Sequence, residues 1–426
     1  MISTRIVTGH PASGASTGGA STRSASTRSA SARTSPPSER PTWVEVDLDA
    51  IAANVAAMKA QARAPKLMAV VKADGYGHGM VPAARAAMAG GADWLAVALV
   101  EEGRGLRAAG IDAPVLLLTE PPESAVTALL DARLTAAVYS PAFTAALETA
   151  VRERGGGPVG VHCKLDTGMR RVGVPQADWD DALRRVRDSD ALRLEGLWSH
   201  FAVADEPGHP FIAHQQAEFA RALDLANSLG VHPELVHLAN SAATLNLPGA
   251  HYDMVRPGLA VYGLEPAPGL AGGTPLTPAL SWRSRFSLVK RLAAGEAVSY
   301  GLRWTAPDDT TVATVPAGYA DGVTRALTNV GEVVTGGRRA PIVGTVCMDQ
   351  FLVEVGDGRV AAGDELCLIG RQGDAAVTAD DWARWLGTIN YEVVCGIGRR
   401  VPRVYVGGAG ASADGAGGGA DCGRPA

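Results

Sequence analysis

Lysine is scarce in this chain of 426 residues, because only five of its 39 basic residues are lysine and the rest are arginine. The chain also lacks an uninterrupted apolar run of about 18 residues, so no membrane span is expected. A formal net charge of −5 and a pI near 6.0 give no broad basic surface for nucleic acid. These absences favour a small-molecule substrate. Chemistry that needs a primary amine is confined to five positions: Lys59, Lys66, Lys72, Lys164 and Lys290.

Cysteine is sparse as well. The five cysteines are odd in number, widely spread and without a C-x-x-C pair: Cys163, Cys347, Cys367, Cys395 and Cys422. Neither a disulfide framework nor a zinc site is therefore predicted, and no metal is expected. Reduced thiols and a cytoplasmic location are the default expectations.

Both ends of the chain are poor in the apolar residues that a core requires. Residues 1–40 are almost all Ser, Thr, Ala, Arg, Gly and Pro, and residues 408–426 are rich in Gly and Ala. Such segments cannot bury enough apolar surface to offset their ordering entropy, so both are predicted to be disordered tails. The first is rich in Arg and Ser, as organelle transit peptides are, but it lacks the apolar stretch of a secretory signal. We interpret it as a dispensable tail or an over-extended start.

The region 41–270 alternates short apolar runs with Ala-rich amphipathic segments, and 46% of the whole chain is hydrophobic. Alternation of strand and helix predicts a parallel sheet, and about eight repeats favour an N-terminal (β/α)₈ barrel. The predicted strands are Trp43–Val46, Leu67–Val71, Trp94–Ala98, Val115–Leu118, Leu134–Val138, Val159–Leu165, Leu194–Trp198, Leu235–Leu238 and Met254–Tyr262. These are nine runs for eight positions, and we expect the first, Trp43–Val46, to pair with the second domain instead.

The alternation of strands and helices stops in the Pro/Gly-rich stretch 265–278. Beyond it, short strands separated by Gly, Pro and Asp turns predict a C-terminal, mainly antiparallel β domain over 271–407. Helical periodicity is scarce there until Ala379–Leu386. The predicted strands are Leu280–Val289, Ala297–Tyr300, Thr311–Val315, Gly331–Val334, Ile342–Val346, Phe351–Val355 and Glu365–Ile369.

Lys72 directly follows the apolar run Leu67–Val71 and precedes the glycine-rich segment 73–79. In a barrel, chemistry takes place at the carboxyl ends of the strands. A lysine there can be partly desolvated, which favours the neutral amine that attacks an aldehyde to form a Schiff base. A solvated surface lysine in a glycine-rich turn is the alternative interpretation of this segment taken alone.

Four other predicted strands also end in polar groups. These are Lys164 to Arg171, His200, Asn240 with Ser241 at a predicted helix start, and Arg256. Small polar groups at a helix start can bind an anion. A single histidine at a strand end is more often structural, but five such strand ends in one barrel predict one shared site.

These segments resemble signatures of the alanine racemase family. The resemblance runs from about Thr42 to Val406 and rests on V-V-K-A-D-G-Y-G-H-G at Val70–Gly79, together with the segments Lys164–Arg171, His200–Glu206, His237–Leu245, Val298–Gly301, Gly318–Gly322, Cys347–Gln350 and Ile389–Glu392. It implies a pyridoxal 5'-phosphate-dependent racemase that interconverts L-alanine and D-alanine and supplies D-alanine for peptidoglycan. It also implies a head-to-tail homodimer with shared active sites.

The resemblance assigns roles to individual residues. Lys72 would hold the cofactor and serve as the base for D-alanine, while Tyr300 of a second subunit would serve L-alanine from the opposite face. Two opposed groups are needed because a proton leaves one face of a planar carbanion and returns to the other.

The other implied site residues surround the cofactor and the substrate. Arg256 would meet the pyridine nitrogen, Arg171 the phenolic oxygen, and Lys164 would be a possible carbamylated lysine that holds Arg171. His200 would lie beside the ring with support from Asn240. The phosphate would be held by Tyr76, Ser241, Tyr391 and the amides of Gly258 and Leu259. Met348 would contact the substrate carboxylate, and the access corridor would be lined by Tyr319, Asp205, Arg325 and Ile389.

Three alternatives stay open at this point. A barrel-type amino-acid decarboxylase shares the cofactor and both domain types, although the segments at Tyr300 and Met348 favour a racemase. A cofactor-carrying module without turnover would need only the barrel. A racemase of serine or of broader specificity would differ only in small changes along the corridor.

Overall fold

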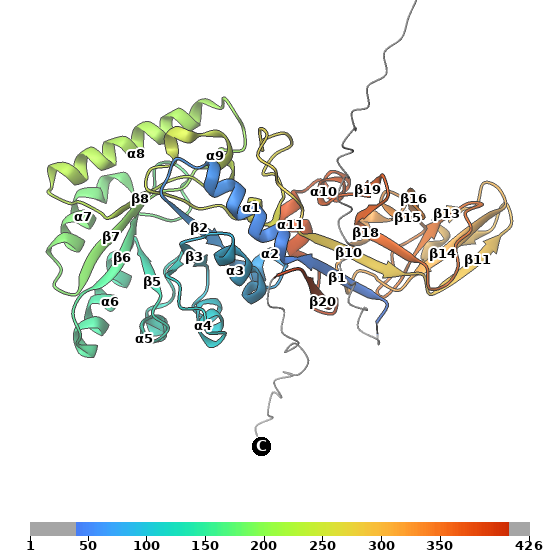
Figure 1. Ribbon diagram of the computed structural model, residues 1–426, viewed down its shortest axis with the longest axis horizontal. Helices are drawn as coiled ribbons and strands as arrows, with labels where there is room; N and C mark the ends of the chain where they lie inside the picture. The colour runs from blue at the N-terminus through green and yellow to red at the C-terminus, as the bar shows by residue number, and fades with distance from the viewer. Residues whose placement is uncertain (1–39, 409–426) are drawn as a thin grey trace, which may run out of the picture. The chain divides into compact units, whose positions relative to one another are not determined.

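The computed structural model describes residues 40–408, which form an eight-stranded sheet, a ten-stranded sheet and a separate two-stranded ribbon (Figure 1). The tails predicted over 1–40 and 408–426 fall outside this range, apart from Arg40 and Gly408. Within the described part of the chain, no helix is long and apolar enough to cross a membrane.

The eight-stranded sheet is a parallel barrel, which confirms the predicted fold class. Its strands follow one another in sequence order: β2 (Lys66–Val70), β3 (Trp94–Val97), β4 (Val115–Leu117), β5 (Thr135–Val138), β6 (Val159–Lys164), β7 (Leu192–Trp198), β8 (Leu235–His237) and β9 (Met254–Val255). β9 pairs with β2, and two further backbone bonds, from Asp253 to Val236 and from Arg256 to Ala239, join its flanks to the β8 side. The ring of strands is thereby closed.

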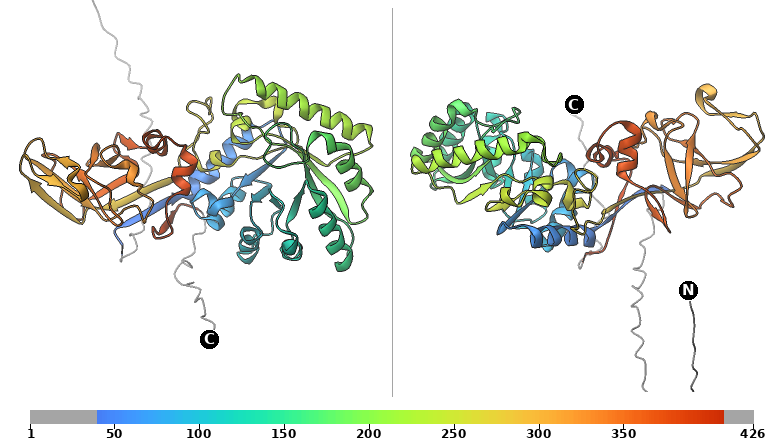
Figure 2. Two further views of the ribbon diagram at one scale, coloured as in Figure 1. Left: turned by 180° about the vertical axis from the view of Figure 1, so that it is seen from behind. Right: turned by 90° about the horizontal axis from the view of Figure 1, so that it is seen from above.

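Helices cover the outer face of the barrel (Figures 1 and 2). They are α1 (Leu48–Gln61), α3 (Met80–Ala89), α4 (Val100–Ala108), α5 (Val126–Asp131), α6 (Pro141–Arg154), α7 (Trp179–Asp188), α8 (Pro210–Ser228) and α9 (Ser241–Asn246), while the short segment α2 (Lys72–Tyr76) lies at the barrel mouth. Local signals start several of them. Asp47 caps α1, Ser140 caps α6 ahead of Pro141, and Pro210 occupies the first turn of α8.

The predicted strand Met254–Tyr262 is wrong beyond Val255. Pro257 has no N–H to donate to a sheet, so the ladder ends and the chain turns into the 3₁₀ helix η4 (Leu259–Tyr262). Arg256 therefore sits at the carboxyl end of a two-residue strand, where it reaches the mouth of the barrel.

The ten-stranded sheet is mainly antiparallel, as predicted. Its order is β11-β14-β17-β16-β15-β18-β10-β1-β20, with β19 paired to β18. The strands are β1 (Thr42–Asp47), β10 (Leu280–Arg285), β11 (Leu288–Leu292), β14 (Thr310–Val315), β15 (Glu332–Thr335), β16 (Arg338–Val343), β17 (Phe351–Glu354), β18 (Glu365–Gln372), β19 (Ala375–Val377) and β20 (Arg403–Val406).

β1 belongs to this sheet and not to the barrel, which confirms the expectation for Trp43–Val46. It pairs antiparallel with β10 and parallel with β20. The barrel is thus inserted between the first two neighbouring strands of the second sheet. The domain limits at 41–270 and 271–407 stay a prediction.

Several details of the β domain differ from the prediction. The run Leu280–Val289 is broken between β10 and β11, and Ala297–Tyr300 contributes only β12 (Ala297–Val298), which pairs with β13 (Trp304–Thr305). Tyr300 instead opens the 3₁₀ turn η5 (Tyr300–Leu302). α10 (Ala379–Leu386) is where helical periodicity predicted it, and α11 (Asn390–Cys395) follows.

Candidate active site

A cavity of about 720 Å³ opens at the carboxyl ends of the barrel strands, with α11 of the β domain as one wall. Of the residues singled out from the sequence, it is lined by Lys72, Tyr76, Lys164, Arg171, His200, Asn240, Ser241, Arg256, Gly258, Leu259, Ile389 and Tyr391. The five strand ends thus contribute to one cavity. The structure shows this geometry, and the role of each residue stays a prediction.

Lys72 is presented by an unusual backbone turn. The four residues after it have left-handed φ values of 53° at Ala73, Asp74 and Tyr76 and 61° at Gly75. For residues other than glycine this conformation costs roughly 1–2 kcal/mol each. Such strain persists only where the surroundings enforce it.

Hydrogen bonds from three directions hold this turn. The Ala73 amide donates to Glu102 at 2.6 Å, and the Asp74 carboxylate accepts the Met80 amide at 2.9 Å. The buried His78 contacts the carbonyl oxygens of Gly75 and Tyr76 through Nδ1, at 3.1 and 2.9 Å. The turn is therefore fixed by its own polar side chains and by α4.

Cationic side chains gather in the cavity. Burial, and then the charge of Arg171, lowers the pKa of Lys72 from its ordinary value. Burial lowers the pKa of Lys164 to about 7, with Arg256 and Arg171 adding to the effect. The lining contains four lysine and arginine side chains but only one carboxylate, that of Glu392. The cavity therefore suits an anionic ligand and a neutral lysine amine.

Arg256 is fixed by four acceptors beneath the cavity. It is buried and donates to the carbonyl oxygens of Ser199 at 2.8 Å and Leu238 at 3.2 Å. It also contacts Nδ1 of His237 at 3.0 Å and Nδ1 of His200 at 3.2 Å. Because a guanidinium only donates, both imidazoles accept at Nδ1 and carry their proton at Nε2.

One corner of the cavity has little room for side chains. Ser241 Oγ accepts the Gly258 amide at 2.8 Å, and Asn240 caps α9 by accepting the Ala243 amide at 3.0 Å. A Cβ atom on Gly258 would collide with the hydroxyl of Tyr76. Burial raises the pKa of Tyr391 to about 12, so its hydroxyl stays a donor at neutral pH. This corner offers hydroxyl groups and close backbone approach to a ligand.

Tyr300 and Met348 do not line this cavity. They lie in a separate hollow of about 620 Å³ in the β domain, together with Tyr319 and Arg325. Tyr300 is 76% exposed. One copy of the chain therefore carries the two expected bases, Lys72 and Tyr300, in two different hollows.

The turn that carries Tyr300 is also strained, and two hydrogen bonds with Thr345 hold it. Ser299 has a φ of 64°. Its Oγ donates to the Thr345 carbonyl at 2.7 Å, and the Thr345 hydroxyl donates to the Tyr300 carbonyl at 2.6 Å. The exposed ring thus projects from a fixed backbone.

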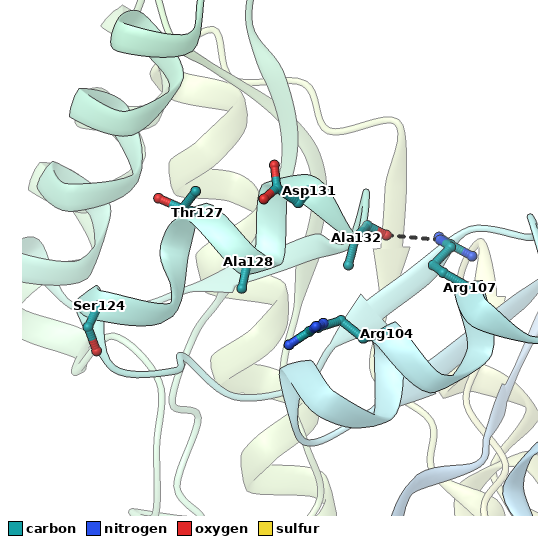
Figure 3. Close-up of a pocket in the computed structure, with 7 residues that line it drawn as sticks. All are labelled: Arg104, Arg107, Ser124, Thr127, Ala128, Asp131 and Ala132. Atoms are coloured by element: carbon teal, nitrogen blue, oxygen red, sulfur yellow. Dashed lines mark hydrogen bonds between the residues drawn. The ribbon is translucent and has the colours of Figure 1, made fainter. Parts of the chain in front are cut away.

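A third hollow, of about 510 Å³, lies on the barrel surface between α4 and the segment η1–α5 (Figure 3). Arg107 on its edge donates to four carbonyl oxygens, those of Ala132, Ile111, Ala113 and Arg133. We interpret this arginine as a tie between α4 and the loops around it, because carbonyl groups occupy its donors.

Sequence reasoning missed some residues around the cavity. Cys395 and Trp198 line it, and His237 lies behind Arg256. His162 contacts His237 and is buried inside the barrel. Strand alternation is a signal for His162, since residues two apart face the same side and Lys164 is its neighbour on that face.

A closed parallel barrel with polar and basic side chains gathered at the carboxyl ends of its strands is the arrangement of barrel enzymes. Models of the alanine racemase N-terminal domain and C-terminal domain match residues 46–266 and 279–405. The chain therefore belongs to the alanine racemase family.

Individual relatives agree with the family match. The alanine racemase of Frankia casuarinae is 50% identical over 368 residues, covering 85% of this chain and 95% of its own. That of Symbiobacterium thermophilum is 49% identical over 369 residues, covering 86% and 98%. Among solved structures, the alanine racemase of D-cycloserine-producing Streptomyces lavendulae has a TM-score of 0.83 at 42% identity and covers 87% and 98%. The Streptomyces coelicolor alanine racemase has a TM-score of 0.81 at 43% identity and covers 86% and 98%.

Proposed function

We propose that this chain interconverts L-alanine and D-alanine with pyridoxal 5'-phosphate bound in the barrel cavity, and that two copies complete each other's sites. The observation that carries the proposal is the placement of Lys72, with its lowered pKa, among Lys164, Arg171 and Arg256 at the barrel mouth. The activity takes place in the cytoplasm and supplies D-alanine for peptidoglycan.

The cavity fits the cofactor in its charge and in the hydrogen-bond donors that it offers. Pyridoxal phosphate is an anion, and the lining offers four basic side chains. The corner at Gly258 brings the hydroxyls of Ser241, Tyr76 and Tyr391 close to bare backbone, and hydroxyl and amide donors of this kind bind phosphate. When bound, the cofactor supplies an aldehyde for a lysine amine and a ring that accepts electrons from the substrate's α-carbon.

Residues on the barrel side would hold and orient the cofactor. Lys72 Nζ would bind it covalently, and the amides of Gly258 and Leu259 would join the phosphate corner. Arg256 would donate a hydrogen bond to the ring nitrogen without giving up its proton, because a guanidinium stays protonated. His200 would lie beside the ring, with Asn240 in support, and Arg171 would donate to the phenolic oxygen.

Proton transfer would be divided between Lys72 and Tyr300. Lys72 Nζ would take the α-proton of D-alanine, and the Tyr300 hydroxyl of a second copy would take that of L-alanine. The exposure of Tyr300 and its separate hollow support this division, since an exposed ring on a fixed backbone can enter a neighbour's cavity. Met348 would approach the substrate carboxylate from the same second copy, and Tyr319 would line the corridor there.

Lys164 is the proposed site of carbamylation. Carbon dioxide reacts with a neutral amine, and a pKa of about 7 leaves a large neutral fraction at physiological pH. The new anion would lie among Arg171, Arg256 and Lys72, whose charges now act on Lys164. A carbamate would thereby convert a repulsive cluster into an attractive one and hold Arg171.

The test is direct. Purified protein supplied with pyridoxal phosphate is incubated separately with L-alanine and with L-serine, and D-enantiomer formation is followed by chiral chromatography. We expect D-alanine from the wild type and at least about 100-fold slower formation from Lys72→Ala, which also loses the visible absorbance of bound cofactor. Release of carbon dioxide without any D-amino acid would identify a decarboxylase, and faster turnover of serine would identify a serine racemase.

A further inference from the structure

A row of three buried side chains crosses the barrel interior behind the cavity. Arg256 NH1 lies 3.0 Å from His237 Nδ1, and His237 Nε2 lies 2.8 Å from His162 Nδ1. The three residues come from the end of β9, from β8 and from β6, and each is at most 3% exposed. The row therefore begins at the cavity floor and ends at His162, deep among the strands.

The donors along the row are fixed by chemistry. A guanidinium donates only, so His237 Nδ1 accepts and His237 carries its proton at Nε2. That proton faces His162 Nδ1, which must accept, so His162 carries its proton at Nε2. Any other arrangement places two protons, or two lone pairs, between neighbouring nitrogens. Burial, with the charge of Arg256 next, lowers the pKa of His162 to about 3, and the same two causes hold that of His237 well below its ordinary value, so both rings are neutral.

The surrounding residues hold the two rings in place. Trp198 stacks on His237 with ring centroids 5.4 Å apart and an interplanar angle of 12°, and Trp94 lies 5.2 Å from His162. Gly196 on β7 makes room for His162, because a Cβ there would lie 2.5 Å from the ring nitrogen Nδ1. A glycine at this strand position is thus required by the histidine beside it.

We propose that His162 is a positioning residue that acts on Arg256 through His237. By accepting the Nε2 proton of His237, it keeps His237 Nδ1 free to accept from Arg256, and it thereby fixes the direction in which the guanidinium faces the cavity. The row itself does not depend on the proposed function. Only its consequence for the bound cofactor rests on that function.

The structure supplies matched variants to test this. In His162→Asn, the side-chain carbonyl takes the position of Nδ1 and can still accept from His237. His162→Leu removes the acceptor. Gly196→Ala keeps His162 but displaces its ring, so it perturbs the row by an independent route.

The measurement is the tautomer of His237 in each purified protein, read from the ¹⁵N signals of ¹⁵N-histidine-labelled samples. We expect an Nε2-protonated His237 in the wild type and in His162→Asn. In His162→Leu and Gly196→Ala the Nε2 proton of His237 loses its acceptor, so we expect this signature to be lost or mixed with the Nδ1-protonated form, in which the Arg256 guanidinium turns away from Nδ1. The dissociation constant for pyridoxal phosphate, measured by fluorescence titration, is expected to rise about tenfold in these two variants and to be largely restored in His162→Asn.

Two results would overturn the proposal. One is an unchanged His237 tautomer in a folded His162→Leu or Gly196→Ala protein. The other is an equal rise of the dissociation constant in His162→Asn and His162→Leu, which would indicate a packing role without a hydrogen-bonding one. Because the tautomer is read without substrate or turnover, a failure of the proposed racemase activity is distinguishable from a failure of this row.

Discussion

Lys164 Nζ lies 4.2 Å from the centre of the Trp198 ring, and the guanidinium carbon of Arg256 lies 4.7 Å from the centre of the same ring. One indole thus faces two basic groups, only one of which can lose its proton near neutral pH. Burial comes first among the causes that lower the pKa of Lys164 to about 7, and Arg256 comes second.

This relationship predicts a pH-dependent stability. Between about pH 7 and the ordinary lysine pKa of 10.5, the unfolded chain binds a proton at Lys164 that the folded chain does not. The unfolding free energy should therefore rise with pH across this window, and the penalty of Lys164 is fully present below it. Relative to the wild type, Lys164→Met should be most favoured near pH 6.5 and lose that advantage toward about pH 10. Urea unfolding of both proteins across this pH range measures the difference in unfolding free energy, and a difference that does not change with pH would contradict the prediction.

The division of the bases between two copies predicts complementation. Lys72→Ala and Tyr300→Phe should each lower turnover by about 10²–10⁴-fold, the usual contribution of a positioned acid or base. Random mixing of equal amounts should restore about one quarter of wild-type activity, because half of the dimers are mixed and each of those has one intact site. Activity is measured after mixing, dissociation and reassociation. A mixture no more active than its components would show that both bases act within one copy.

The corner at Gly258 predicts a defect in cofactor binding. Gly258→Ala places a methyl group against the Tyr76 hydroxyl, and either the tyrosine or the backbone must move. We expect a 10- to 100-fold weaker affinity for pyridoxal phosphate, about 1.4–2.7 kcal/mol. Gly249→Ala is the matched control, since its new methyl group meets nothing within 4 Å. Fluorescence titration of both variants measures the difference, and equal affinities would refute the assignment of this corner.

The left-handed turn after Lys72 predicts that a glycine substitution there lowers turnover without lowering stability. Ala73→Gly relieves a backbone strain of roughly 1 kcal/mol, so the unfolding free energy should rise or stay unchanged. The same change frees the backbone next to Lys72, and turnover should fall. Ala56→Gly, in the middle of α1, should instead destabilise by about 0.5–1 kcal/mol without affecting turnover. Urea unfolding and racemisation assays of both variants decide the matter. A clear loss of stability in Ala73→Gly would contradict the strain.

The guanidinium of Arg256 is expected to control the balance between racemisation and side reactions. In Arg256→Glu a carboxylate can accept a hydrogen bond from a protonated ring nitrogen, which makes the cofactor a stronger electron acceptor. We expect racemisation to slow on the order of 100-fold while transamination increases. The two rates are measured as D-alanine and pyruvate formation. An equal loss of racemisation and transamination, with the cofactor still bound, would contradict this role of Arg256.

Much of the cavity could be predicted from the sequence, because apolar strands are followed by polar residues. Apolar runs give the strands of the barrel, and polar residues near the ends of these strands lie at the mouth, where Lys72, His200 and Arg256 come together. Short strands were harder. Pro257 ended β9 after two residues, β13 has only two residues, and β19 and β20 were not predicted.

Other features depend on residues far apart in sequence. Ala73 and Tyr76 do not favour a left-handed backbone, and hydrogen bonds with Glu102 and His78 hold the turn. His162 could have been assigned to the interior by its spacing from Lys164, but its bond to His237 joins positions 75 residues apart. The residue pattern alone does not separate Tyr300 from Lys72, and only the family resemblance predicted that they act from different subunits.

The placement of β1 also has a consequence for how the protein is made. β1 pairs with β10 and β20, yet the whole barrel is synthesised between β1 and β10. As the chain leaves the ribosome, the barrel strands are available to one another while β1 still waits for its neighbours. The second sheet reaches its full set of strands only when Arg403–Val406 emerges, so a stalled or shortened product would leave an open strand edge on an otherwise finished barrel, a ready surface for aggregation.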